Sequence, residues 1–139
     1  MTKALIIYHS KTGNTKQFAE GIAKHLISQG IETQVTSTVL YSNAMLEGVS
    51  HIFFGCWTSG LFFFLQKPEK AWMNFVGRIA GKPDAKVALF TTYKLLTGSM
   101  FSNMAKALAG KFSPPAITLK SRNVRLSDEH KKILDDFIA

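Results

Sequence analysis

The sequence is poor in cysteine and in acidic residues, and each shortage limits what the chain can be. Its single cysteine, Cys56, excludes an internal disulfide and any metal site built from cysteines alone. There are 17 Lys and Arg against 9 Asp and Glu, although charged residues make up only 19% of the chain. The net charge of +8 therefore reflects missing acids rather than dense basic runs.

The missing acids leave two long stretches without a negative charge. No Asp or Glu lies between Glu47 and Glu69, or between Asp84 and Asp128. The second stretch still carries Lys86, Lys94, Lys106, Lys111, Lys120, Arg122 and Arg125. One region of the surface should be markedly positive, which favours an anionic partner: an acidic protein, a phosphorylated cofactor, nucleic acid or a membrane surface. Nucleic acid is disfavoured, because the charges are dispersed and no RNA- or DNA-binding motif accompanies them.

Long hydrophobic runs are also missing. The apolar run at residues 1–8 is shorter than the core of a signal peptide and lacks a cleavage site. The run at residues 52–65 is interrupted by Gly55, Thr58, Ser59 and Gly60, so it does not predict a membrane span. We therefore expect a soluble, reduced protein of the cytoplasm.

Five apolar segments have the length and pattern of strands: residues 3–8, 31–39, 50–54, 86–91 and 116–120. Between and after them, apolar residues at helical spacing predict helices over 14–28, 68–81, 100–109 and from Ser127 onward, with a short helical turn at 42–47. Met73, Met100 and Met104 are interpreted as core residues of these helices. Strict alternation of strand and helix predicts one α/β domain over residues 1–139, with a parallel sheet covered by helices on both faces.

Ligands of an open parallel sheet bind beyond the carboxyl ends of its strands. Here that edge receives the loops at 9–15, 55–66 and 91–99, all rich in Gly, Ser, Thr and aromatic residues. The first loop joins a buried strand to a helix N-terminus, where free backbone N–H groups attract anions. Three hydroxyls, an amide and a flexible glycine suit a phosphate dianion. The loop has neither the GK[ST] ending of a triphosphate-binding loop nor a GxGxxG pattern.

Residues 6–22, IIYHSKTGNTKQFAEGI, resemble the flavodoxin signature. The signature's constrained positions are filled by Tyr8, Ser10, Gly13, Thr15, Ala19 and Ile22. The resemblance implies a three-layer flavodoxin-like fold, with a five-stranded parallel sheet in order 2-1-3-4-5, and an FMN cofactor. It also implies that phosphate is bound by the side chains of Ser10, Thr12, Asn14 and Thr15 and by the backbone of Lys11 and Gly13.

The second loop resembles the family segment that lies on the inner face of the flavin. Cys56, Thr58 and Gly60 match that segment, and Gly60 takes the position whose peptide can turn toward N5 of the reduced flavin. The usual stacking aromatic occurs two residues early, as Trp57, with Ser59 in its place. Cys56 is either a packed thiol or a thiol beside the flavin.

Large apolar residues follow this loop where family members usually carry acids. They form the run Leu61-Phe62-Phe63-Phe64-Leu65. One interpretation is packing beneath the sheet, and the other is an apolar lid or docking surface, since four consecutive large side chains cannot all face one core.

The third loop contains Thr92, Tyr93 and Lys94. In the family this loop grips the pyrimidine edge of the flavin and often supplies a tyrosine on its outer face. Tyr93 is the candidate for that stacking role, although it sits earlier than usual, and a packing or surface role is the alternative. Lys94 occupies a place where acids are common.

These features predict an FMN-binding electron-transfer protein whose redox partners have acidic surfaces. The alternative is an FMN-dependent oxidoreductase acting on a quinone, a tetrapyrrole or a similar flat apolar substrate, for which residues 61–65, Trp57 and Tyr93 are the motive. A third hypothesis is a binding module that keeps the fold without flavin. The sequence shows no catalytic acid–base set and no metal-ligand spacing.

Overall fold

A computed structural model describes residues 2–10, 13–57, 70–93 and 100–139 of the chain. Strands and helices alternate along it in the predicted order. The elements are β1 (Lys3–His9), α1 (Asn14–Ser28), β2 (Glu32–Ser37), the 3₁₀ helix η1 (Asn43–Leu46), β3 (His51–Cys56), α2 (Lys70–Arg78), β4 (Lys86–Thr92), α3 (Met100–Leu108), β5 (Ile117–Ser121) and α4 (Asp128–Ile138).

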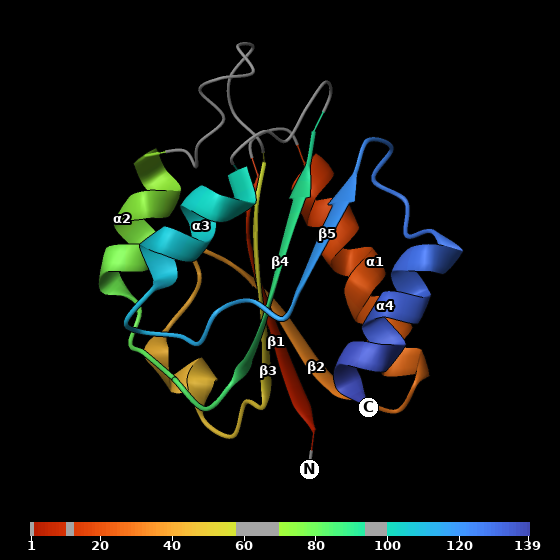
Figure 1. The fold of residues 1–139 in the computed structure, drawn as a ribbon, viewed down its shortest axis with the longest axis horizontal. Coiled ribbons are helices and arrows are strands. Elements are labelled where there is room, and N and C mark those ends of the chain that lie inside the picture. The colour runs from red at the N-terminus through yellow and green to blue at the C-terminus, as the bar shows by residue number, and fades with distance from the viewer. Residues whose placement is uncertain (1, 11–12, 58–69, 94–99) are drawn as a thin grey trace.

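The strands form one parallel sheet in the order β2-β1-β3-β4-β5, which confirms the predicted topology. Helices α2 and α3 cover one face of the sheet, and α1 and α4 cover the other (Figure 1). All the strands point toward the same edge, and both chain termini lie at the opposite edge (Figure 1). The three-layer α/β fold expected from the alternation is therefore the observed one.

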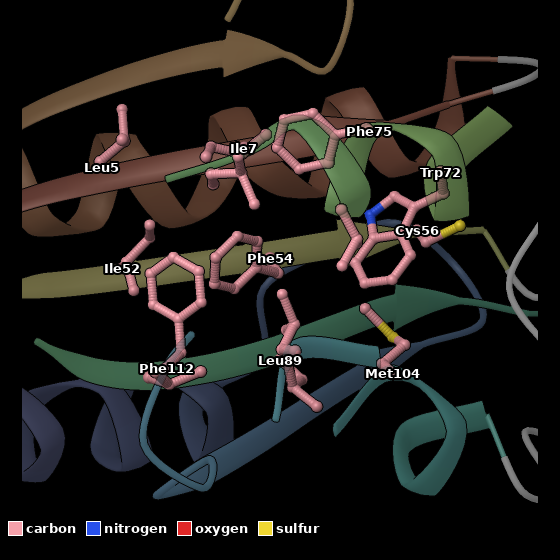
Figure 2. Close-up of a cluster of buried hydrophobic side chains, with 14 of the residues drawn as sticks. Leu5, Ile7, Ile52, Phe54, Cys56, Trp72, Phe75, Leu89, Met104 and Phe112 are labelled. Atoms are coloured by element: carbon pink, nitrogen blue, oxygen red, sulfur yellow. The ribbon is translucent and has the colours of Figure 1, made fainter. Parts of the chain in front are cut away.

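Strand alternation divides the core between the two faces of the sheet. In β1, Leu5 and Ile7 face α2 and α3, whereas Ala4 and Ile6 face α1 and α4, and all four are fully buried. Figure 2 shows the first cluster, in which side chains of β1, β3 and β4 meet residues of α2 and α3. Apolar runs in the strands follow from this double burial, because neither face is left to water.

Helix α1 has the bounds that its periodicity predicts. Phe18, Ile22 and Leu26 recur every fourth residue and are fully buried against the sheet. Past its end, Gly30 adopts a left-handed φ of 81°, and the Ile31 N–H donates to the Leu26 carbonyl at 3.0 Å. This is the glycine-dependent termination typical of helices.

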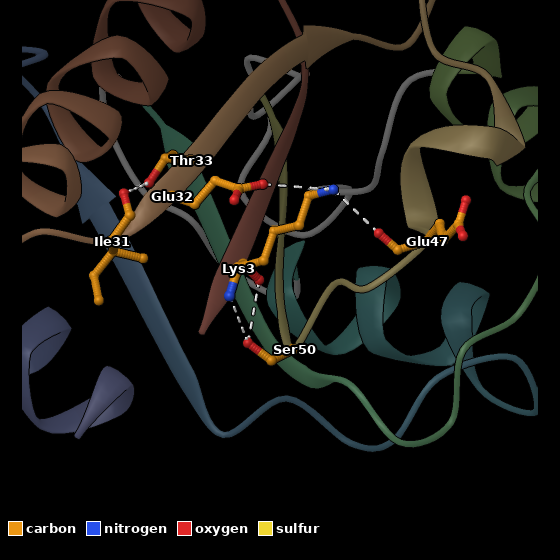
Figure 3. A network of polar contacts seen from close by, with 6 residues as sticks. All are labelled: Lys3, Ile31, Glu32, Thr33, Glu47 and Ser50. Carbon is orange, nitrogen blue, oxygen red and sulfur yellow. Dashed lines mark hydrogen bonds and ion pairs between the residues drawn. The ribbon is translucent and has the colours of Figure 1, made fainter. Parts of the chain in front are cut away.

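At the amino edge of the sheet, Lys3 ties three segments together. Its backbone N–H donates to the Ser50 hydroxyl at 3.0 Å, and its ammonium donates to the Glu47 carbonyl at 3.1 Å (Figure 3). The same ammonium lies 3.7 Å from a carboxylate oxygen of Glu32. These contacts anchor β1, β2 and the start of β3 far from the carboxyl edge, where ligands are expected.

Three boundaries differ from the predicted ones by two residues or more. Strand β3 continues through Gly55 and Cys56, which were expected in a loop. The strand predicted over 31–39 ends at Ser37, and Val39 beyond it is 82% exposed. Helix α2 ends at Arg78, short of the predicted 81, and the Lys111 ammonium donates to the carbonyls of Val76 and Ile79 at this end, each at 2.9 Å. Residues 68 and 69, the predicted helix start, lie outside the described residues.

The interpretation of the methionines is confirmed for two of them. Met100 and Met104 are fully buried, but Met73 is 42% exposed. Met73 follows the buried Trp72 by one position, and on a helix that 100° step carries it away from the sheet-facing side.

His51, at the start of β3, makes stability sensitive to acid. Burial lowers the pKa of this imidazole below its ordinary value of 6.5, the Lys86 charge lowers it further, and the Phe137 backbone acts weakly in the opposite direction. Its Nδ1 is 2.8 Å from the Ser50 hydroxyl. The unfolded chain therefore takes up a proton more readily than the folded chain, so the free energy of unfolding should fall as the pH drops below about 6.5.

We expect His51→Gln to reduce that pH dependence. Urea denaturation at about pH 7.5 and about pH 5.5 should show a larger loss of stability for the wild type than for the variant, because the glutamine does not titrate. Identical losses in both proteins would show that other groups cause the acid sensitivity.

Candidate functional site

The amino end of α1 lies at the carboxyl edge of the sheet and is open to an anion. Gly13 is its N-cap, with a left-handed φ of 93°, and its N–H donates to the Ser10 hydroxyl oxygen at 2.9 Å. The first N–H groups of a helix have no carbonyl partner within it, and the N-cap residue, Gly13, has no side chain to accept from them. Apart from its chain neighbours and the backbone of the helix, no atom of the described residues lies within 4 Å of where a Cβ on Gly13 would be. The result is an uncapped helix N-terminus beside open space, flanked by the Ser10 hydroxyl and the exposed amide of Asn14.

Thr15 links this helix to the third predicted segment. Its side chain is fully buried, and its hydroxyl oxygen is 2.8 Å from that of Thr92, at the end of β4. Two residues 77 positions apart in sequence, both predicted as site residues, therefore share a hydrogen bond.

The second segment continues directly from β3. The Trp57 N–H donates to the His9 carbonyl at 3.3 Å, which prolongs the β1–β3 pairing, and the Trp57 side chain is half-buried. Cys56 is the last strand residue, and its thiol is fully buried in the core cluster that includes Trp72 and Met104 (Figure 2). Of the two interpretations of Cys56, the structure thus supports the packed thiol.

Thr91 was not predicted as a site residue, yet its hydroxyl connects two of these segments. Its buried hydroxyl donates to the Cys56 carbonyl, which joins the ends of β3 and β4. The sequence feature that could have indicated this contact is a threonine at the end of an otherwise apolar strand, because a buried hydroxyl needs a hydrogen-bond partner.

Tyr93 contacts cations contributed by the neighbouring strand. Its N–H donates to the Ser121 carbonyl at 3.2 Å. The Lys120 ammonium lies 5.8 Å from the centre of its ring, and the Arg122 guanidinium carbon lies 5.2 Å from it. The β4–β5 register, in which Thr92 pairs with Ser121, produces this approach. The predicted strand order does not give this register, so the approach of the two cations to Tyr93 could not be predicted from the sequence.

Several predicted site residues lie outside the described residues. They are Lys11, Thr12, Thr58, Ser59, Gly60, Lys94 and the apolar run Leu61 to Leu65. Their roles stay predictions.

The expected positive region is smaller than the acid-free stretch suggests. Lys111 is bound to the end of α2, and Lys86 starts β4 at the opposite edge of the sheet. Lys120, Arg122 and Arg125 do lie together, around Tyr93 and the start of α4. Charge at the carboxyl edge therefore comes mainly from the β5 end among the described cations.

Fold and site together define a three-layer α/β protein whose first helix begins at the carboxyl edge of its sheet. A family model described as "Flavodoxin domain" matches residues 5–114. The chain belongs to this flavodoxin domain family, which confirms the resemblance carried by residues 6–22.

Solved structures show the same fold at low sequence identity. A flavodoxin from the domain Archaea is 21% identical, with a TM-score of 0.69 and coverage of 98% of this chain and 93% of that chain. The two-electron reduced flavodoxin of Megasphaera elsdenii is 18% identical, with a TM-score of 0.75 and 97% of each chain covered. The rubredoxin oxygen:oxidoreductase of Desulfovibrio gigas is 16% identical, with a TM-score of 0.75; the match covers 99% of this chain and 34% of that chain.

FMN is the cofactor of this family, and the described residues fit its phosphate. The fit rests on the uncapped N-terminus of α1, the open space beside Gly13 and the polar side chains of Ser10 and Asn14. Thr15 is fully buried and its hydroxyl is paired with that of Thr92, so its contact with phosphate stays a prediction. When bound, FMN supplies the electron-transfer chemistry through its isoalloxazine ring. None of the helices in the described ranges combines the length and apolarity needed to cross a membrane.

Proposed function

We propose that this chain is a cytoplasmic FMN-dependent electron carrier that exchanges electrons with proteins bearing acidic surfaces. The observation that carries the proposal is the amino end of α1, where Gly13, Ser10 and Thr15 surround an uncapped helix terminus. The phosphate would accept hydrogen bonds from the side chains of Ser10, Thr12, Asn14 and Thr15 and from the backbone of Lys11 and Gly13. Neutral donors and a helix dipole suffice for a dianion.

The isoalloxazine would then lie between the other two segments. On one side it would meet the segment from Cys56 to Gly60, with Trp57 as the aromatic nearest the strand end. On the other side it would meet Thr92, Tyr93 and Lys94. The Thr15–Thr92 hydrogen bond supports this arrangement, because it fixes the phosphate end and the third segment relative to each other.

Visible absorption spectra of the purified protein, before and after addition of FMN, test the proposal. We expect flavin bands displaced from those of free FMN, and we expect Thr12→Ala and Thr15→Ala each to weaken binding because phosphate oxygens lose donors. A colourless protein that does not bind added FMN would contradict the proposal.

The alternative function is oxidation or reduction of a quinone, a tetrapyrrole or a similar flat apolar substrate. Its motive is the run Leu61 to Leu65, which lies outside the described residues, together with the half-buried Trp57 and with Tyr93. Rapid reoxidation of the reduced protein by a quinone, but not by carrier proteins, would favour this enzyme over the carrier.

The charge pattern predicts an unusual redox potential. The three loops contain no acid, and Lys11 and Lys94 belong to them. Among the described residues, Lys120 and Arg122 also lie at Tyr93. Cations stabilise an anionic reduced flavin, so the potential of the fully reduced couple should be less negative than in acidic flavodoxins. A potentiometric titration measures it, with Lys94→Glu expected to make the potential more negative. A strongly depressed second potential in the wild type would refute the prediction.

A further inference from the structure

A basic groove lies between the end of β5 and the start of α4. Its volume is about 440 Å³, and its lining contains no Asp or Glu. It is lined by Tyr93, Lys120, Ser121, Arg122, Asn123, Arg125, Leu126, Ser127 and His130. Its three cations are all exposed. Within the described residues, neither Lys120 nor Arg125 forms an ion pair.

A hydrogen-bonded turn fixes the backbone next to these cations. The Asn123 carboxamide oxygen accepts from the Ser121 hydroxyl at 3.0 Å and from the Arg125 N–H at 3.1 Å. Between them, Val124 has a left-handed φ of 56°, which is rare for a β-branched residue. The turn thus keeps a conformation that the local sequence disfavours, and it fixes the backbone from which Arg122 and Arg125 project.

His130 fixes the turn to the sheet and to α1. Its Nδ1 accepts from the Ser127 N–H at 3.1 Å, so its Nε2, 3.0 Å from the Lys120 carbonyl, is the donor to that oxygen. Its ring also packs against Phe18, with 5.4 Å between ring centres. The turn that lines the groove is therefore attached to the folded core through His130.

Tyr93 connects the groove to the cofactor segment. It belongs to the groove lining, and it also follows directly after Thr92, whose hydroxyl meets Thr15. A partner bound in the groove would consequently lie next to the segment proposed to hold the flavin edge.

We propose that this groove docks a carboxylate-rich segment of the redox partner, an inference that rests on the proposed carrier function. Lys120, Arg122 and Arg125 supply charge complementarity for Asp and Glu side chains. Exposed Asp128 and Glu129 border the groove in the first turn of α4. They repel a continuous phosphate backbone, whereas a protein surface of mixed charge can place a Lys or Arg against them. An acidic protein therefore fits the groove better than a nucleic acid.

Fluorescence anisotropy with a dye-labelled peptide that carries a run of glutamates and a pair of lysines tests the groove in the FMN-loaded protein. Lys120→Gln/Arg125→Gln should weaken peptide binding about tenfold. The matched control, Lys24→Gln/Lys106→Gln, removes the same charge from exposed positions on α1 and α3 and should change binding less than about twofold. The weakening should also shrink as salt is raised.

Two outcomes would overturn the docking proposal. One is equal weakening in both double variants, which would mean attraction by net charge alone. The other is a single-stranded oligonucleotide of the same length that binds the wild type more tightly than the peptide and loses that affinity only in the groove variant. Flavin absorption, recorded on every sample, separates the two proposals. Absence of bound flavin would refute the carrier function. If FMN is bound but the groove variant binds the peptide as tightly as the wild type does, only the docking site is refuted.

Discussion

Replacing Gly55 by alanine is expected to destabilise the folded protein by about 3 kcal/mol. A Cβ at this position would lie 2.0 Å from Cε2 and 2.1 Å from Cζ of Phe90, which pairs with Gly55 across β3 and β4. Phe90 is fully buried and packs edge-on against Phe18, with 6.0 Å between ring centres. The ring therefore has no solvent-filled space into which it can retreat, and β3 itself must shift. Urea denaturation, followed by circular dichroism, measures the loss.

Gly77→Ala is the matched control for this substitution. Gly77 is exposed on α2, and a Cβ there meets no atom within 4 Å, so alanine should stabilise the helix by about 1 kcal/mol. A second test is Gly55→Ala combined with Phe90→Leu, which removes the clashing ring atoms. The alanine should cost less in that background than in the wild type, giving a favourable coupling energy. Two results would contradict the role assigned to the Phe90 ring. One is that the stability losses of Gly55→Ala and Phe90→Leu simply add in the double variant. The other is that the Gly55→Ala protein is as stable as the Gly77→Ala protein.

The same contact explains why the sequence misplaced the end of β3. A glycine followed by Cys-Trp-Thr-Ser-Gly is typical of a loop, because glycine packs poorly within a strand. Here the Phe90 ring of the neighbouring strand fills the space that a side chain would occupy. Recognising this requires the β3–β4 register, which only the assembled sheet provides.

The helix bounds that depend on residues close together in the sequence were predictable. Phe18, Ile22 and Leu26 fixed the bounds of α1, and Ser127 was correctly predicted to cap α4. The predicted start of this helix is thus confirmed, but the part that His130 plays in the cap was not predicted. Its Nδ1 accepts from the Ser127 backbone, in the place where a capping box ordinarily has a Glu or Gln.

In the candidate site too, the contacts between residues close together in the sequence were predicted, and the contacts between distant segments were not. The sequence brought Ser10, Gly13 and Thr15 together because they are near neighbours on one loop. It identified Tyr93 but not the cations over its ring, since Lys120 and Arg122 are distant along the chain. Contacts between strands depend on register, and strands buried on both faces lack the alternation of apolar and polar residues that would specify it.

Thr15→Val should weaken FMN binding by about ten- to a hundredfold while leaving riboflavin binding nearly unchanged. Valine keeps the shape of the fully buried side chain but removes the hydroxyl proposed to donate to phosphate. Hydrogen bonds to charged groups contribute about 1.5–3 kcal/mol, which sets this range. Riboflavin has no phosphate, so the ratio of the two dissociation constants isolates the phosphate contact from general damage to the site. Titration with each flavin, followed by quenching of flavin fluorescence, measures that ratio.

Thr92→Val provides the control, because it breaks the same 2.8 Å contact from the other side. It leaves the Thr15 hydroxyl in place, so any harm from the lost Thr15–Thr92 bond should affect FMN and riboflavin alike and preserve their ratio. The two variants should lose similar stability in the absence of flavin, since each leaves one buried hydroxyl without its partner. If Thr15→Val instead weakens both flavins equally, Thr15 acts by tying α1 to β4, and the phosphate must depend on Ser10, Asn14 and the backbone of the helix terminus.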